Sequence, residues 1–195
     1  RRKRHGPLRV QRPFYPEGRY GCCHVYLLHP PGGLVSGDEL RIEASVGKGG
    51  HVLLTTPAAA KLYKADSHGV AWGQHTRLQV AQNEILALGR PASKLPFVSG
   101  HLEQRFSLLM DGRPLWLERQ LMDPAHPRFK GHWGQGGASV QATLWVVGLE
   151  DEAASIDELR EALPANHRWA VTRRRGVVLL RYLGQERNEA WALCQ

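Results

Sequence analysis

Apolar and polar residues alternate along much of the chain, and a period of two predicts β-strands. The alternation is clearest over residues 40–46, where Leu40, Ile42, Ala44 and Val46 fall on one face. Similar patterns predict strands at 22–28, 70–80, 102–110 and 114–121, and an edge strand within 6–16 that ends at prolines. We therefore expect a mainly β, long antiparallel body over residues 1–137.

Glycine and proline mark the turns between these strands. Gly47 to Gly50 and Asp111-Gly112 predict hairpin turns, so that residues 51–56 form the returning strand of the first hairpin. After that strand, Thr56 and Pro57 have the residue types of the N-cap and first turn of a short helix.

The C-terminal part has a different pattern. A strand is predicted at 138–148, and Ser155 to Glu158 match a capping box that opens a helix ending near Pro164. Two more strands, 169–172 and 177–183, flank the basic turn Arg173 to Gly176, and a helix starts at Gln185. This order predicts a small α+β lobe over residues 138–195, packed on the β body.

The segment from Pro30 to Leu40 is the most constrained turn in the chain. Its prolines fix the backbone, and its glycines allow positive φ or close backbone approach. A phosphate-binding loop would need Gly-Lys-Ser/Thr at its end, but here Gly37 is followed by Asp38, whose charge repels phosphate. We interpret the segment as a tight structural turn with a capping acid.

Composition adds a basic balance. The formal charge is +8, which attracts acidic partners: nucleic acid, a membrane surface or an acidic protein face, unless the basic side simply faces water. Three cysteines, Cys22, Cys23 and Cys194, make a poor disulfide framework, so we expect a reducing compartment. No apolar run is long enough to span a membrane.

Candidate chemistry is sparse. Cys22 and His24 share a strand face, and thiolate and imidazole both suit Ni(II), so they are the candidate metal ligands. A free cysteine is, however, more often a small buried hydrophobe. No Ser/His/Asp order or pair of acids has a convincing pattern, and we predict no catalytic residue.

Several long motifs occur together, in order, over most of the first hundred residues. They lie at 6–16, 23–35, 37–38, 55–63 and 88–91, and the region 181–184 also fits. Together they resemble the urease accessory protein D family (UreD, called H in some bacteria). Family members usually have tens of additional residues before the motif at 88–91. We therefore expect a missing segment at or near Asn83-Glu84, and a truncated C-terminus after Gln195.

The resemblance implies a cytoplasmic scaffold and not an enzyme. Such proteins bind apo-urease and the accessory proteins F and G, with two copies of each assembled through protein F, and have no membrane partner. Nickel passes through an internal channel and no cofactor is tightly held. The implied fold is wound like a helix of strands.

The resemblance also suggests roles for individual residues. The turn residues Pro31, Gly32, Gly33, Gly37 and Asp38 would line the nickel channel, although Asp38 is more simply interpreted as a turn cap. Four other motif residues would contact a partner or pack internally: Thr56, Lys61, Tyr63 and Arg90.

A basic nucleic-acid-binding module is the alternative function, motivated by the charge and by six tryptophans. Against it, the chain has no recognised nucleic-acid motif and its lysines and arginines are scattered. We expect no nucleic-acid partner. A hydrolase is a third and weaker option.

Overall fold

Strands dominate the computed structural model, which describes residues 6–18, 21–31, 33–57, 61–63, 70–81, 85–90, 102–123, 126–163 and 168–192. The strands are β1 (Arg9–Val10), β2 (Cys23–Leu28), β3 (Gly33–Leu34), β4 (Glu39–Val46), β5 (His51–Thr55), β6 (Lys61–Leu62), β7 (Trp72–Val80), β8 (Ile85–Arg90), β9 (Leu102–Met110), β10 (Arg113–Met122), β11 (Val140–Val147), β12 (Trp169–Arg174) and β13 (Val177–Gly184). The helices are α1 (Pro127–Lys130), α2 (Glu152–Ala162) and α3 (Arg187–Ala192). The mainly β prediction is confirmed.

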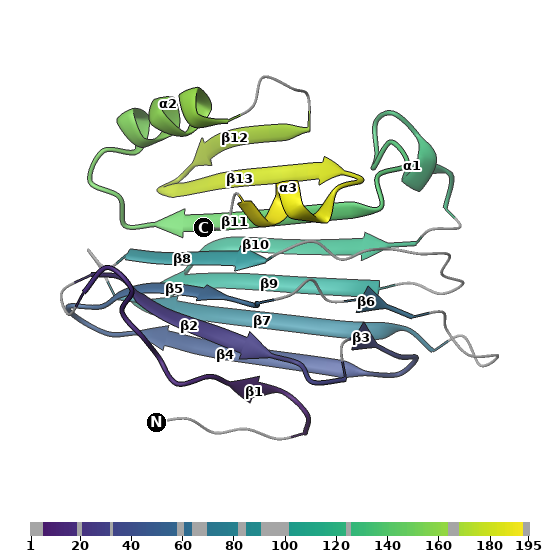
Figure 1. The fold of residues 1–195 in the computed structure, drawn as a ribbon, viewed down its shortest axis with the longest axis horizontal. Helices are drawn as coiled ribbons and strands as arrows, with labels where there is room; N and C mark the ends of the chain where they lie inside the picture. The colour runs from purple at the N-terminus through teal and green to yellow at the C-terminus, as the bar shows by residue number, and fades with distance from the viewer. Residues whose placement is uncertain are drawn as a thin grey trace.

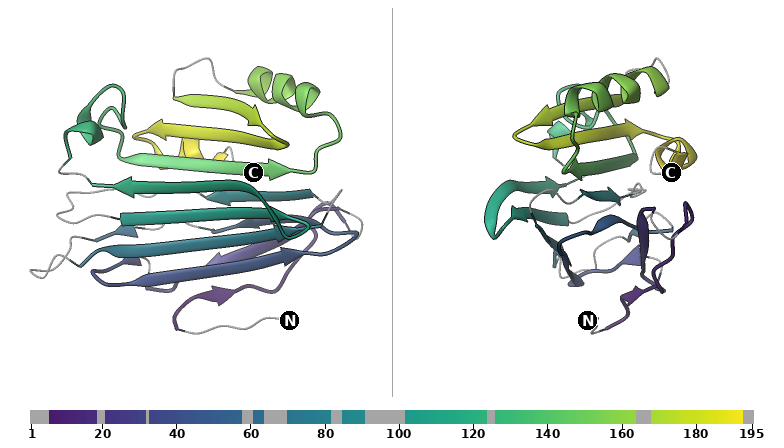
Figure 2. Two further views of the ribbon diagram at one scale, coloured as in Figure 1. Left: turned by 180° about the vertical axis from the view of Figure 1, so that it is seen from behind. Right: turned by 90° about the vertical axis from the view of Figure 1, so that its left-hand side faces the viewer.

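Two long sheets and one short sheet organise these strands (Figure 1). The seven-stranded sheet has the order β1-β2-β5-β8-β11-β13-β12, the four-stranded sheet has the order β10-β9-β7-β4, and β3 pairs with β6. Figure 2 shows the four-stranded sheet from its outer side and the two long sheets edge-on, as separate layers.

The chain reaches this arrangement by winding from one sheet to the other. A first coil runs through β2, β3 and β4, a second through β5, β6 and β7, and a third from β8 to β9. Equivalent strands of successive coils pair in parallel: β2 with β5 and β5 with β8, and likewise β4 with β7 and β7 with β9. The body is therefore wound like a helix of strands, as the resemblance implied. The prediction of an antiparallel body is wrong, because in a wound body the neighbours in each sheet are equivalent strands of successive coils, which run in the same direction.

The C-terminal strands extend the seven-stranded sheet. Strand β11 pairs with β8 on one side and with β13 on the other, both antiparallel. Ile156 of α2 packs on Val178 and Leu180, and Ala190 of α3 packs with Ala142 and Tyr182, so both helices cover the same face of this part of the sheet.

The main core fills the space between the two long sheets. It contains Val46, Leu78 and Val80 from the four-stranded sheet and Leu54 and Val147 from the seven-stranded sheet. Ile42 and Ala44 pack against the same cluster, so the inward face predicted for residues 40–46 is correct. No helix among the described residues is long and apolar enough to cross a membrane.

Three local predictions are wrong. Residues 47–50 do not close a hairpin, because β4 pairs with β7 while the following β5 belongs to the other sheet. Lys61 and Leu62 form strand β6, where a short helix was expected, because they pair in parallel with Gly33 and Leu34. Helix α2 begins after Asp151 and not at Ser155, since the Asp151 carboxylate accepts the N–H groups of Ala153 and Ala154.

The second hairpin prediction is confirmed. Strands β9 and β10 pair antiparallel across Asp111 and Gly112. Both turn residues have positive φ, 47° and 75°, which is the backbone of a two-residue turn that matches the strand twist.

Candidate functional site

The core between the two long sheets changes from apolar to polar along the strands. At the end marked by Val46 and Val80 the inward side chains are aliphatic. Towards the start of β7 they become Thr76 and Gln74, each only 4% exposed. Burial of polar groups costs free energy unless they are hydrogen-bonded. Polar side chains at one end of the core therefore require hydrogen-bond partners or a functional explanation.

A row of amides crosses the inner face of the four-stranded sheet at this polar end. Gln74 lies opposite Gln104 on β9, and Gln104 lies opposite Gln120 on β10. The row then reaches the seven-stranded sheet, because Gln141 Nε2 on β11 donates to Gln120 Oε1 at 3.4 Å. Gln135 Nε2 donates in turn to Gln141 Oε1 at 3.2 Å. We call these five glutamines the glutamine row.

The glutamine row ends in an open cavity of about 390 Å³. Its walls come from the end of β10, from β11 and from the end of β13, and include Arg119, Thr143 and Arg181 beside Gln120 and Gln141. This cavity lies where the edge strand β10 meets β11 and β13, and we call it the mouth of the glutamine row.

A carboxylate stands beside the glutamine row. Glu118 points inward on β10 and its side chain is 13% exposed. It accepts from Arg181 Nη2 at 2.9 Å, from Trp116 Nε1 at 3.2 Å and from Gln120 Nε2. The acid is thus tied to both sheets and to the row.

Five further polar atoms are buried in the two sheets without a partner among the described residues. They are the hydroxyls of Thr55 and Thr76 and the indole Nε1 atoms of Trp72, Trp145 and Trp169. Amide and hydroxyl oxygens are weak ligands for a divalent ion. The glutamine row contains no thiolate or imidazole, the groups that would bind such an ion tightly. A divalent ion held by these oxygens alone would be bound weakly.

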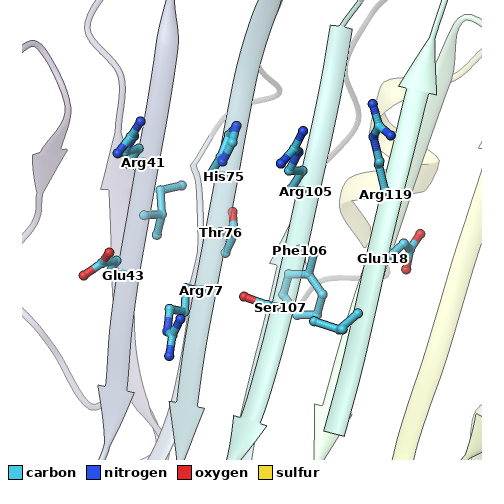
Figure 3. Close-up of a pocket in the computed structure, with 12 residues that line it drawn as sticks. Arg41, Glu43, His75, Thr76, Arg77, Arg105, Phe106, Ser107, Glu118 and Arg119 are labelled. Atoms are coloured by element: carbon cyan, nitrogen blue, oxygen red, sulfur yellow. The ribbon is translucent and has the colours of Figure 1, made fainter. Parts of the chain in front are cut away.

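The outer face of the four-stranded sheet has a second, charged arrangement. Arg41, His75, Arg105 and Arg119 lie opposite one another on four adjacent strands and form one basic row (Figure 3). The row lines a groove of about 640 Å³.

Two glutamates form ion pairs with side chains of the basic row. Glu39 Oε1 lies 2.9 Å from Arg41 Nη2 and 3.8 Å from His75 Nε2. Glu103 accepts from Arg119 Nε at 2.9 Å and from Arg105 Nε, and these two hydrogen bonds hold the pKa of Glu103 below its ordinary value. These two glutamates lie in the row next to the basic row on the same face.

The turn before β4 is built as a capped turn. The Asp38 carboxylate accepts the Val35 N–H at 2.9 Å, and the Asp38 carbonyl accepts the Gly73 N–H at 2.8 Å. Gly37 has a φ of +80°, which favours glycine. These bonds place the turn beside the start of β7, near the polar end of the core; a role for Asp38 on a cation route stays a prediction.

Of the other turn and motif residues, Gly33 in β3 lies opposite Lys61 in β6. Gly33 is buried in β3, Pro31 is exposed, and Gly32 lies outside the described residues. Thr56 is half-buried after β5, and Tyr63 is 45% exposed with its N–H bonded to the Leu34 carbonyl. Only the backbone of Lys61 in β6 and of Arg90 in β8 is described.

Cys22 and His24 lie at the start of β2. His24 Nε2 is 3.0 Å from Glu17 Oε1. Burial, and then the charge of Glu17, raise the pKa of the Cys22 thiol. The described residues include no group of three or more His, Cys, Asp or Glu side chains that could hold a metal ion.

The sequence analysis missed the glutamine row and Glu118. Gln74 was visible as a polar residue on the inward face of an alternating strand, between Trp72 and Thr76. This inward-facing amide was the available sign of a polar region in the core. The pairing of β7, β9 and β10, which aligns the glutamines, was not readable from local patterns.

Comparison with known proteins gives a consistent picture. The model of the UreD urease accessory protein family matches residues 1–86 and 83–195. The chain is 69% identical to the urease accessory protein UreD of Marinobacter nauticus over an alignment of 230 residues, covering all of this chain and 77% of that protein. It is 58% identical to the UreD of Chromohalobacter salexigens over 237 residues, covering all of this chain and 76% of that protein. It is 37% identical to the UreD of Saccharophagus degradans, covering 93% and 75%.

Proposed function

Because this chain belongs to the UreD family of urease accessory proteins, which act in urease maturation, we propose that it is a scaffold through which nickel reaches apo-urease. The protein makes and breaks no covalent bond in this role. It bridges apo-urease and the accessory proteins F and G in the cytoplasm, in an assembly joined through protein F.

The observation that supports the nickel route is the glutamine row. A core made only of aliphatic side chains would be more stable, since buried amides must be satisfied by partners. The row follows the strand register from Gln74 to Gln120 and hydrogen bonds from Gln120 to Gln135, and it ends in an open mouth. Its amide oxygens would offer a cation successive weak ligands. Weak binding is what transit requires, because a tightly held ion would not move on.

Partner binding is supported by three exposed apolar side chains, one of which, Leu121, lines the mouth of the glutamine row. Leu117 and Leu121 point outward on β10 and are 71% and 61% exposed, and Trp133, in the turn after α1, is 98% exposed. Tryptophan and arginine are typical of the central contacts of protein interfaces, and Arg119 lies between the two leucines.

The route is tested by replacing Gln104 and Gln120 with leucine, which is similar in volume. We expect a folded protein that still co-purifies with proteins F and G but activates urease poorly in cells expressing the urease genes with nickel. Gln79→Leu, on the outer face of β7, is the matched control. Full activation by the double variant would exclude the glutamine row as the route, and loss of the complex would show a structural role.

The nucleic-acid alternative has its own test. A basic module would bind duplex DNA near physiological salt, with affinity falling as salt rises. We expect no such binding, since the basic row is braced by Glu39 and Glu103.

A further inference from the structure

The coils of the β body have a nearly constant length, which the pairing of their strands measures. Gly33 pairs with Lys61 of the next coil, a sequence separation of 28. Glu39 pairs with Gly73, a separation of 34. Trp72 pairs with Leu102, a separation of 30. One coil of this solenoid therefore has a sequence length within this narrow range.

The aligned stretch of each relative is longer than this chain by a similar amount. The alignment with the Marinobacter nauticus protein covers 230 positions although the chain has 195 residues, a difference of 35. For the Chromohalobacter salexigens protein, with 237 positions, the difference is 42. The two stretches matched by the family model overlap at residues 83–86, which follow the end of β7 at Val80 and include the first residues of β8, which starts at Ile85. The expected site of the missing segment, Asn83-Glu84, falls within this overlap and lies outside the described residues.

The connection from β7 to β8 is a place where a whole coil fits. A segment that leaves β7 and returns to β8 starts at the end of one sheet and ends at the beginning of the other, as each existing coil does. If this segment consists of a strand, a corner and a strand, the same side chains of β7 and β8 still face inward. A structureless loop of this length would be uncommon in a compact domain.

We infer that this chain lacks one complete coil of the solenoid that its relatives possess. When the coil is removed, the exposed edges of β5 and β7 can pair with the next coil. Strand β5 then pairs in parallel with β8, and β7 with β9, without a shift of register. These two pairs are the joint. The inference does not depend on the proposed function.

The joint changes the outer surface. His75 on β7 lies opposite Arg105 on β9 (Figure 3), and an interposed strand would move them apart by about 4.8 Å. The basic row is continuous here because the coil is missing. A partner that contacts both β4–β7 and β9–β10 would meet a surface one strand narrower than in the relatives.

Engineered disulfide cross-links, which form only between cysteines close in space, test the inference on the full chain. Arg77 on β7 lies opposite Ser107 on β9, so Arg77→Cys with Ser107→Cys should cross-link across the joint. Glu43 on β4 lies opposite Arg77, so Glu43→Cys with Arg77→Cys is the control pair within one side of the joint. Mild oxidation followed by mass spectrometry of the linked peptides distinguishes both from pairs formed by the native cysteines.

Each pair is then placed in a variant that carries the additional Marinobacter nauticus residues between Asn83 and Glu84. An interposed strand separates the two Cα atoms by about 9.6 Å, beyond the roughly 7 Å that a disulfide spans. We expect the joint pair to lose its cross-link by at least about tenfold while the control pair keeps it. An undiminished cross-link in the joint pair would show a loop outside the solenoid and overturn the inference.

A misfolded insertion variant would be recognised because its control pair would also fail. In that case the same two pairs are introduced at the aligned positions of the Marinobacter nauticus protein, where the control must cross-link and the joint pair must not. Cross-linking of both pairs there would contradict the inference equally. Failure of the joint pair in the present chain, with the control intact, would also overturn it.

Discussion

Arg181 Nη2 lies 2.9 Å from both carboxylate oxygens of Glu118 and so joins β13 of the C-terminal region to β10 of the β body. Strand β10 is at the edge of the four-stranded sheet and β13 is in the seven-stranded sheet. The pair therefore bridges the two sheets at the mouth of the glutamine row.

Arg181→Met should destabilise the protein by about 1–2 kcal/mol, because the mostly buried Glu118 carboxylate loses its counter-charge while the side-chain stem is kept. Urea unfolding followed by tryptophan fluorescence measures the change. Arg174→Met, an exposed position on neighbouring β12, is the control and should stay within about 0.5 kcal/mol. Equal effects of both substitutions would mean that the Arg181–Glu118 bridge adds no stability.

Glu103 predicts an acid-sensitive contribution to stability. Its folded-state pKa is lowered, mainly by the hydrogen bonds from Arg119 and Arg105, so the folded state favours the ionised form. The contribution is present above the ordinary pKa of 4.5 and is lost as pH falls through the lower folded value. The melting temperatures of wild type and Glu103→Gln should therefore differ at neutral pH and converge as the pH falls below 4.5 and through the lowered pKa of the folded state.

The matched control for Glu103 is Glu43→Gln, an exposed glutamate on the same outer face. Its difference from wild type should not follow the same pH dependence if the two arginines are the cause. A constant gap between wild type and Glu103→Gln across this pH range would contradict the prediction.

Local patterns predicted most strands but not how they pair. The alternation from Leu40 to Val46 set the inward face of β4 correctly, because one buried face suffices to fix it. Both glycine-rich turns looked like hairpins, yet only Asp111-Gly112 is one. A turn signal specifies a bend, whereas the partner of a strand in a coiled body lies a whole coil away in the sequence, as Gly73 does from Glu39. The glutamine row depends on those distant pairings and was therefore not readable.

Leu117 and Leu121 predict a partner contact. Leu117→Ser with Leu121→Ser should leave folding stability nearly unchanged, because both side chains are exposed. Affinity for the partner that covers them should fall by about 1–2 kcal/mol, roughly tenfold or more. Binding to accessory protein F, to protein G and to apo-urease is measured separately.

The control for the two leucines is Val35→Ser, a 52% exposed apolar residue in the turn before β4. It should reduce none of the three affinities if the docking surface is confined to β10. Unchanged binding of all three proteins to the double variant would show that the outer face of β10 is not a docking surface.

Cys22 and His24 should not form a nickel site at neutral pH. The metal ligand is the thiolate, and burial together with the charge of Glu17 raises the pKa of the Cys22 thiol above its ordinary value of 9.0. The Nε2 atom of His24 is already bonded to Glu17. Calorimetric titration at pH 7 of Cys22→Ala with His24→Ala should therefore match that of wild type. Loss of a nickel site in the double variant at this pH, with an unchanged melting temperature, would show that the two side chains do bind the ion.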